Sequence, residues 1–184
     1  MMLWEQAGKQ NTQDTAMAAM KRAQELGINT IAVATNTGYT LEHFYDHGLN
    51  LVAVTHHIGF AGPGVDEAGP EKRREWAELG IPVLTTTHLL GGIDRAVTNA
   101  FKGAYPAQII AQTLRMFGQG VKVAVEIAVM ALDAGLIPYG QEVISVGGSS
   151  EGADSAVVIW PEHSNNFFKT QIREIICMPR IKQR

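Results

Sequence analysis

The segment Thr30-Ile-Ala-Val-Ala-Thr-Asn-Thr-Gly-Tyr-Thr40 changes from apolar to small and polar halfway along its length. Its first part, Ile31 to Ala34, is apolar and β-branched, which is typical of a buried strand. Thr35-Asn-Thr-Gly38 then combines two hydroxyl side chains, an amide side chain and a glycine, which has no side chain. Beyond this loop, apolar residues recur at helical spacing from Leu41 to Tyr45, and Gly48 predicts the end of the helix.

A strand, a small loop that contains glycine, and a helix form the geometry in which backbone N–H groups and the helix dipole converge on an anion. The hydroxyls of Thr35, Thr37 and Thr40 supply further donors, so the segment predicts a phosphate-binding loop. The alternative is an ordinary strand-to-helix turn, in which Thr or Asn only caps the helix. The loop has neither the Gly-Lys-Ser/Thr of a Walker A loop nor a Gly-x-Gly-x-x-Gly fingerprint. The segment alone leaves both interpretations open.

Two more buried strands are predicted further along the chain, at Leu51 to Val54 and Ile81 to Thr85. Helices are predicted around them, from Asn11 or Thr12 to about Leu26 and between Pro70 and Gly80. Strands that alternate with helices imply βαβ units and a parallel sheet, and ligands of such sheets bind outside the carboxyl ends of the strands. This rule places three loops on one rim: Thr35–Thr40, His56–Phe60 and Thr87–Gly92.

The remaining chain predicts three helices and then three strands with no long helix between them. The helices are expected at 93–101, 106–117 and 121–134, and the strands at 142–146, 155–160 and 172–177. The third helix is hydrophobic almost all round and should be buried, so its lone acid Glu126 either faces the ligand or is structural. Asp133, near the end of this helix, is expected to have a structural role. The loop Gly147–Asp154 either wraps a ligand or forms a hairpin turn.

The composition is that of an ordinary globular protein, with 184 residues, 46% hydrophobic and 18% charged residues. This length predicts a single domain over residues 1–184. The formal net charge of −3 argues against a nucleic-acid partner. No apolar run has membrane-spanning length and Met1 to Gln10 lacks a signal-peptide core, so we expect a cytoplasmic protein without a membrane partner. The single cysteine, Cys177, fits a reducing compartment, and its apolar neighbours indicate a buried, inert thiol.

The six histidines raise the possibility of a metal site, but their spacing does not favour one. His43 and His47 are four residues apart on a predicted helix without the glutamate of a metalloprotease motif. Adjacent His56 and His57 point to opposite sides in an extended segment. We therefore expect no metal site, and expect His56, His57 and His88 to bind a ligand or to act as an acid or base.

The residues also resemble a known family. The strand, Thr35-Asn-Thr-Gly-Tyr-Thr40, the helix and Leu51-Val-Ala-Val-Thr55 resemble the C-terminal α/β domain of pyruvate kinase. The whole chain is similar to small stand-alone prokaryotic proteins built on that domain. The strings that carry this second resemblance are Asn11-Thr12, Val54-Thr-His-His-Ile-Gly-Phe60, Val125-Glu-Ile127, Val146-Gly-Gly148, Gly152-Ala-Asp-Ser-Ala-Val-Val158, Asn165-Asn-Phe-Phe168 and Glu174-Ile-Ile-Cys-Met-Pro-Arg180.

The resemblance implies a three-layer α/β/α sandwich with a mostly parallel mixed sheet whose last core strand is antiparallel. It implies no kinase activity, because the catalytic residues of pyruvate kinase lie in a barrel domain that this chain does not contain. In the kinase, the corresponding loop holds a phosphate of an allosteric sugar bisphosphate. FMN is the ligand associated with the stand-alone group. Tyr39 departs from the kinase loop, which carries a basic or small residue there, and a tyrosine is better suited to stacking on a flat ring.

Taken together, the residues and the resemblance lead to the hypothesis of a cytoplasmic homo-oligomer that binds FMN or a related nucleotide. The alternative is an enzyme that depends on a flavin or phosphate ligand and uses a rim histidine as acid or base. The phosphate is expected at Thr35, Asn36, Thr37, Gly38 and Thr40. The ring is expected near Tyr39, His56, His57, Gly59 and Phe60, with Thr87, His88, Gly147 and Gly148 completing the pocket.

Overall fold

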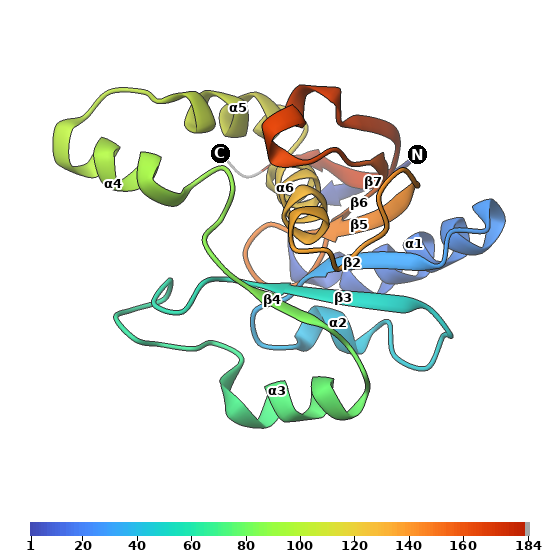
Figure 1. The fold of residues 1–184 in the computed structure, drawn as a ribbon. Helices are drawn as coiled ribbons and strands as arrows, with labels where there is room; N and C mark the ends of the chain where they lie inside the picture. Colours follow the sequence, from blue (N-terminus) through green and yellow to red (C-terminus); the bar gives the residue numbers. More distant parts are fainter. Residues whose placement is uncertain (183–184) are drawn as a thin grey trace.

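The computed structural model describes residues 1–182, which form a seven-stranded sheet flanked by helices (Figure 1). The strands are β1 (Met2–Gln6), β2 (Thr30–Ala34), β3 (Asn50–Thr55), β4 (Val83–Thr85), β5 (Val143–Gly147), β6 (Ser155–Trp160) and β7 (Gln171–Ile181). The helices are α1 (Thr12–Leu26), α2 (Tyr39–Glu42), α3 (Gly69–Glu78), α4 (Gly92–Phe101), α5 (Pro106–Arg115) and α6 (Gln119–Asp133), with the short 3-10 helices η1 (Lys9–Asn11) and η2 (Ser164–Lys169). None of the helices described could cross a membrane.

The strand order is β1-β7-β6-β5-β2-β3-β4, and the sheet is mostly parallel. β2 pairs in parallel with both β3 and β5, and β4 pairs in parallel with β3. β6 runs antiparallel to β5 and to β7, and the edge strand β1 is parallel to β7. The mixed sheet expected from the resemblance is therefore confirmed. The antiparallel strand is β6, and β7 adds a further strand that runs in the parallel direction again.

Two hydrophobic clusters on opposite faces of the sheet make the three layers. Ile31 and Val33 of β2 pack on one face with α1, α2 and α3, whereas Ala32 packs on the other face with α6. This division follows from the alternation of side chains along a strand. α6 is buried over nearly its whole length, as its sequence predicts, because α5 covers part of the side that faces away from the sheet (Figure 1).

One predicted element is much shorter in the structure. The helix expected from Leu41 to Gly48 is reduced to the single turn of α2, Tyr39–Glu42. The chain then leaves the helix, with Asp46 at φ 61° and Gly48 at φ 68° in the left-handed region. Phe44, which helical spacing assigned to the helix, is instead buried in the core from a turn. The helix dipole invoked for the phosphate loop is therefore small, because it grows with the number of aligned peptides.

Three smaller expectations are resolved by the fold. The loop from Gly147 to Asp154 joins the adjacent antiparallel strands β5 and β6, so it is a hairpin connection. Asp133 has the expected structural role, since it accepts hydrogen bonds from His163 Nδ1 at 2.9 Å and from the N–H of Ser164 at 3.2 Å. Cys177 is buried, and its burial raises the pKa of the thiol to about 11, which makes it unreactive.

Candidate functional site

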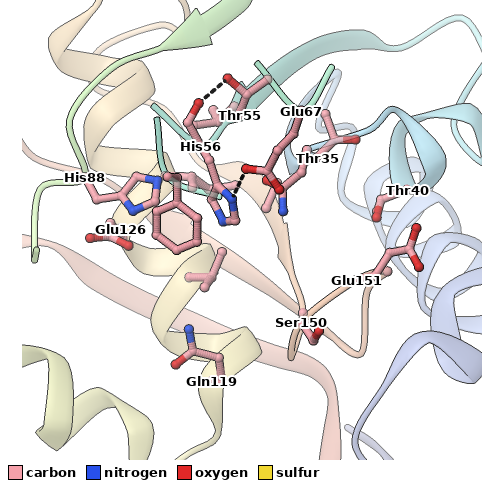
Figure 2. Close-up of a pocket in the computed structure, with 18 of the residues that line it drawn as sticks. Thr35, Thr40, Thr55, His56, Glu67, His88, Gln119, Glu126, Ser150 and Glu151 are labelled. Carbon is pink, nitrogen blue, oxygen red and sulfur yellow. Dashed lines mark hydrogen bonds and ion pairs between the residues drawn. The ribbon is translucent and has the colours of Figure 1, made fainter. Parts of the chain in front are cut away.

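A cavity of about 520 Å³ lies at the carboxyl ends of β2 and β3, on the rim where the sequence predicts the ligand (Figure 2). This volume falls within the range of small-molecule sites, about 300–1,000 Å³. One wall is formed by the loop after β2, and the opposite wall by the loops after β3 and β4 together with α6. Part of the β5–β6 hairpin, from Gly148 to Gly152, closes a third side.

Most of the predicted site residues do line this cavity. Those that line it are Thr35, Asn36, Thr37, Tyr39, Thr40, His56, Phe60, His88 and Gly148. Those outside its lining are Gly38, His57, Gly59, Thr87 and Gly147. Gly147 packs against α6 instead, where an added Cβ would lie 2.3 Å from the carbonyl oxygen of Gly120. His57 is turned toward its own loop, with Nδ1 2.9 Å from the carbonyl oxygen of Ile58.

The loop after β2 presents several hydrogen-bond donors that have no protein partner. Among residues 1–182, the N–H groups of Asn36, Thr37, Tyr39 and Thr40 donate to no protein acceptor. Thr40 as a residue is only 4% exposed, and its hydroxyl makes no hydrogen bond within the described part of the chain. It lines the cavity, as the close-up shows (Figure 2). Thr37 is exposed and Asn36 and Tyr39 are half-buried, so these donors face solvent or the cavity and are available to an acceptor group on a ligand.

Gly38 holds this loop in shape. Its φ is 101°, and its N–H donates to Thr35 Oγ1 at 3.2 Å. A Cβ at this position would lie 2.8 Å from Cδ of Lys72. The Lys72 ammonium is itself held by Glu42 at 2.8 Å and by Glu75 at 2.7 Å, and these carboxylates raise its pKa. Glycine is thus needed at position 38 both for its backbone conformation and for the close approach of Lys72.

Tyr39 lines the cavity, but one face of its ring is already covered. Lys9 Nζ lies 3.9 Å from the ring centroid and also bonds Glu151 at 2.8 Å. His43 packs edge-on against the same ring, with centroids 5.2 Å apart. Lys9 therefore joins the N-terminal segment, the loop after β2 and the β5–β6 hairpin along one side of the cavity. The contact is a cation–π interaction of a kind that the sequence gives no means to anticipate.

The opposite wall carries a cluster of rings. The rings of His56 and Phe60 lie with centroids 3.8 Å apart and planes tilted by 32°, and His88 lies 5.2 Å from His56 and 5.4 Å from Phe60. His56 Nδ1 is 2.8 Å from a carboxylate oxygen of Glu67, which orients its ring. Burial lowers the pKa of His88 to about 4; Glu126 opposes this shift, and His56, Lys122 and His57 reinforce it. His88 is therefore neutral at pH 7.

Glu126 and Lys122 form a buried ion pair at the base of this wall, and both line the cavity. Glu126 Oε1 also accepts a 2.6 Å hydrogen bond from the N–H of Leu90, in the loop after β4. Burial lowers the pKa of Lys122; Glu126 opposes this shift, while Arg115 and Arg95 act in the same direction as burial. The role of Glu126, which the sequence left undecided, thus includes holding the loop that carries His88.

The sequence interpretation missed several lining residues, chiefly charged ones. These are Glu67, Arg95, Arg115, Gln119, Lys122, Ser150, Glu151 and Gly152. Arg95, Arg115 and Lys122 come from three different helices, so no local motif brings them together. The spacing of Lys122 and Glu126, four residues apart on a buried helix, is the one signal that could have indicated the ion pair.

The fold and the cavity define an α/β sandwich domain with a cavity at the carboxyl ends of its parallel strands. The chain belongs to the pyruvate kinase alpha/beta domain family, which matches residues 13–159. That match runs from α1 to β6 and confirms both the resemblance and the fold class.

Among solved structures, the chain is similar to a pyruvate kinase from Cryptosporidium parvum, with 17% identity and a TM-score of 0.38 over 74% of this chain and 20% of that one. A structure of the Cryptosporidium parvum enzyme in complex with ADP is similar with 18% identity and a TM-score of 0.38, over 80% of this chain and 22% of that one. The chain thus covers about a fifth of the length of these kinases.

Proposed function

We propose that this protein binds a phosphorylated small molecule, FMN or a related nucleotide, in the cavity at the rim of the sheet. In this proposal it has a binding or regulatory role and no kinase activity. The observation that carries the proposal is the set of unpartnered donors on the loop after β2, next to a cavity of about 520 Å³. A phosphate group offers several acceptor oxygens, which the N–H groups and the Thr40 hydroxyl can bind together.

The opposite wall supports an aromatic group on this ligand. The rings of His56, Phe60 and His88, tilted against one another by 32° to 59°, give a partly apolar aromatic surface, and His56 and His88 lie across the cavity from Thr40 (Figure 2). Tyr39 presents only part of its ring, since Lys9 covers one face. We therefore assign the ring of the ligand mainly to His56, Phe60 and His88, with the phosphate on the loop after β2.

Titration of the purified protein with FMN tests the proposal, with riboflavin as the ligand that lacks the phosphate. We expect FMN to bind at least tenfold more tightly than riboflavin, measured by quenching of flavin fluorescence. Thr37→Glu places a carboxylate among the phosphate donors and should abolish FMN binding. Gln13→Glu, which adds the same charge on an exposed turn of α1, should leave it unchanged. A protein that binds neither flavin would refute the FMN assignment.

A second candidate function is an enzyme in which His88 acts as a base on the bound ligand. The observation that favours it is that His88 is neutral, partly buried and part of the cavity lining. The place of His88 in the cavity is what favours this role, because a pKa of about 4 makes its imidazole a weaker base than one that titrates near pH 7. Turnover that survives in His88→Gln, with ligand affinity unchanged, would exclude this role.

The cytoplasmic location and the homo-oligomer also remain proposals. Apolar side chains on α4 support the oligomer, since Ile93 is 77% and Phe101 78% exposed. Large apolar groups at the surface of a monomer often mark a contact with another chain. Light scattering of the purified protein gives its mass directly, and a mass of one chain at micromolar concentration would contradict the oligomer.

A further inference from the structure

The ring end of the cavity carries more positive than negative charge. Arg95 from α4, Arg115 at the end of α5 and Lys122 from α6 all line the cavity, and Lys122 pairs with Glu126 at this end. Arg95 lies with its Cζ 5.7 Å from the centroid of Phe60, which places it beside the cluster of rings. His88 and Glu126 lie on this same side, across the cavity from Thr40 (Figure 2).

The two carboxylates at this end are already engaged. Glu126 pairs with Lys122, and Glu67 holds His56. Among residues 1–182, no carboxylate oxygen lies within 4.0 Å of the guanidinium nitrogens of Arg95 or Arg115. Arg115 donates from Nε to Gln119 Oε1 at 2.6 Å, which is a neutral acceptor. Neutral His88 adds no charge at pH 7.

The charges of the three cations interact with one another. Arg115 and Arg95 both act to lower the pKa of Lys122, which means that they lie near enough to repel its ammonium group. An anion or a partial negative charge between them would relieve this repulsion. The arrangement is therefore suited to a ligand group that carries negative charge.

We infer that the ring end of the cavity favours negative charge on the flavin ring, so that the protein binds reduced FMN more tightly than oxidised FMN. This inference rests on the proposed function. Two-electron reduction of oxidised flavin with uptake of one proton, FMN + 2e⁻ + H⁺ → FMNH⁻, leaves one negative charge on the ring. Dithionite supplies the electrons in the experiment below. Tighter binding of the reduced form raises the midpoint potential of the bound flavin, because the two equilibria are linked.

The midpoint potential of FMN bound to the protein, measured against a reference dye, tests the inference. We expect it to be more positive than that of free FMN. Arg95→Gln and Arg115→Gln each remove one charge, and each should reduce the preference for the reduced form about tenfold, which corresponds to about 30 mV for a two-electron couple. Arg74→Gln is the matched control, because Arg74 is exposed on α3 and does not line the cavity.

The outcomes separate the inference from the proposed function. FMN that binds, with a potential equal to that of free FMN, would overturn the inference and leave the binding function intact. A shift in Arg74→Gln as large as that in Arg95→Gln would also overturn it, because the effect would then come from overall charge. Failure of FMN to bind the wild-type protein at all would refute both.

Discussion

The Glu126 carboxylate accepts a hydrogen bond of 2.6 Å from the backbone N–H of Leu90. This contact ties the buried helix α6 to the loop after β4, which carries His88. The other oxygen of Glu126 bonds the ammonium of Lys122. One side chain thus holds the ring-bearing loop in place and balances the buried cation beneath it.

Glu126→Gln should destabilise the fold by about 3 kcal/mol, because it leaves the buried Lys122 ammonium without a charge partner. Glutamine keeps the acceptor for Leu90, so the loss reports mainly on the ion pair. The double variant Lys122→Met/Glu126→Gln should recover most of the stability, since no unpaired charge remains. Urea unfolding monitored by circular dichroism measures all three proteins. If Glu126→Gln and the double variant were equally stable, the unpaired Lys122 charge would not be the cause of the lost stability.

Gly38→Ala should destabilise the protein by about 1–3 kcal/mol, because Gly38 has a φ of 101° and faces Lys72 closely. Gly27→Ala is the control, with a φ of 68° and no atom within 4 Å of the added Cβ. Gly27 lies close to the left-handed helical region (φ 68°, ψ 26°) and Gly38 lies outside it (φ 101°, ψ −22°), so a larger loss at Gly38 in thermal unfolding reports its stronger backbone strain together with the contact with Lys72. FMN affinity should fall in Gly38→Ala alone.

Stability should decrease as the pH falls from about 6.5 to about 4, because His88 has a pKa of about 4 in the folded protein and its ordinary pKa of 6.5 in the unfolded chain. Between these values the unfolded chain binds a proton that the folded protein does not, so acid favours unfolding. The effect is of the order of 1–3 kcal/mol. Comparison of wild type with His88→Gln at pH 7 and pH 5 measures it. An identical pH dependence in both proteins would contradict the assignment to His88.

Thr12→Val should destabilise the protein by about 1–3 kcal/mol, because it removes a buried hydroxyl that serves two partners. Thr12 Oγ1 donates to the carbonyl oxygen of Lys9 at 2.6 Å and accepts from the N–H of Ala153 at 3.0 Å. It thereby joins the start of α1 to the β5–β6 hairpin. Thr113→Val, at an exposed position of α5, should have a small effect. Chemical denaturation of both variants compares the two sites.

Local patterns were sufficient for most of the fold. The apolar runs at 31–34 and 51–54 become the adjacent parallel strands β2 and β3, and the hydrophobic stretch at 121–134 becomes the buried helix α6. Alternation of strands and helices correctly predicted the parallel core. The rule that ligands bind outside the carboxyl ends of parallel strands likewise predicted that the loops after β2, β3 and β4 line one cavity. These features depend on residues close together in the chain, which a pattern can detect.

The structure differs from the sequence interpretation where a residue packs against a segment that lies far away in the chain. Phe44 leaves the predicted helix because the core buries it from a turn, so α2 has only four residues. The face of Tyr39 is covered by Lys9, which lies thirty residues earlier in the chain. Neither contact leaves a periodic signal, because each depends on how separate elements pack.

The amino-acid sequence by itself determined β2 to β7, the order of helices around them, and the hydroxyl-rich loop from Thr35 to Thr40. Only the tertiary structure decided the charge at the far side of the cavity, where Arg95, Arg115 and Lys122 meet from three helices. The physical reason is the distance over which each effect acts. Propensity and periodicity act within a few residues, whereas the field in a cavity sums charges from every element that packs around it.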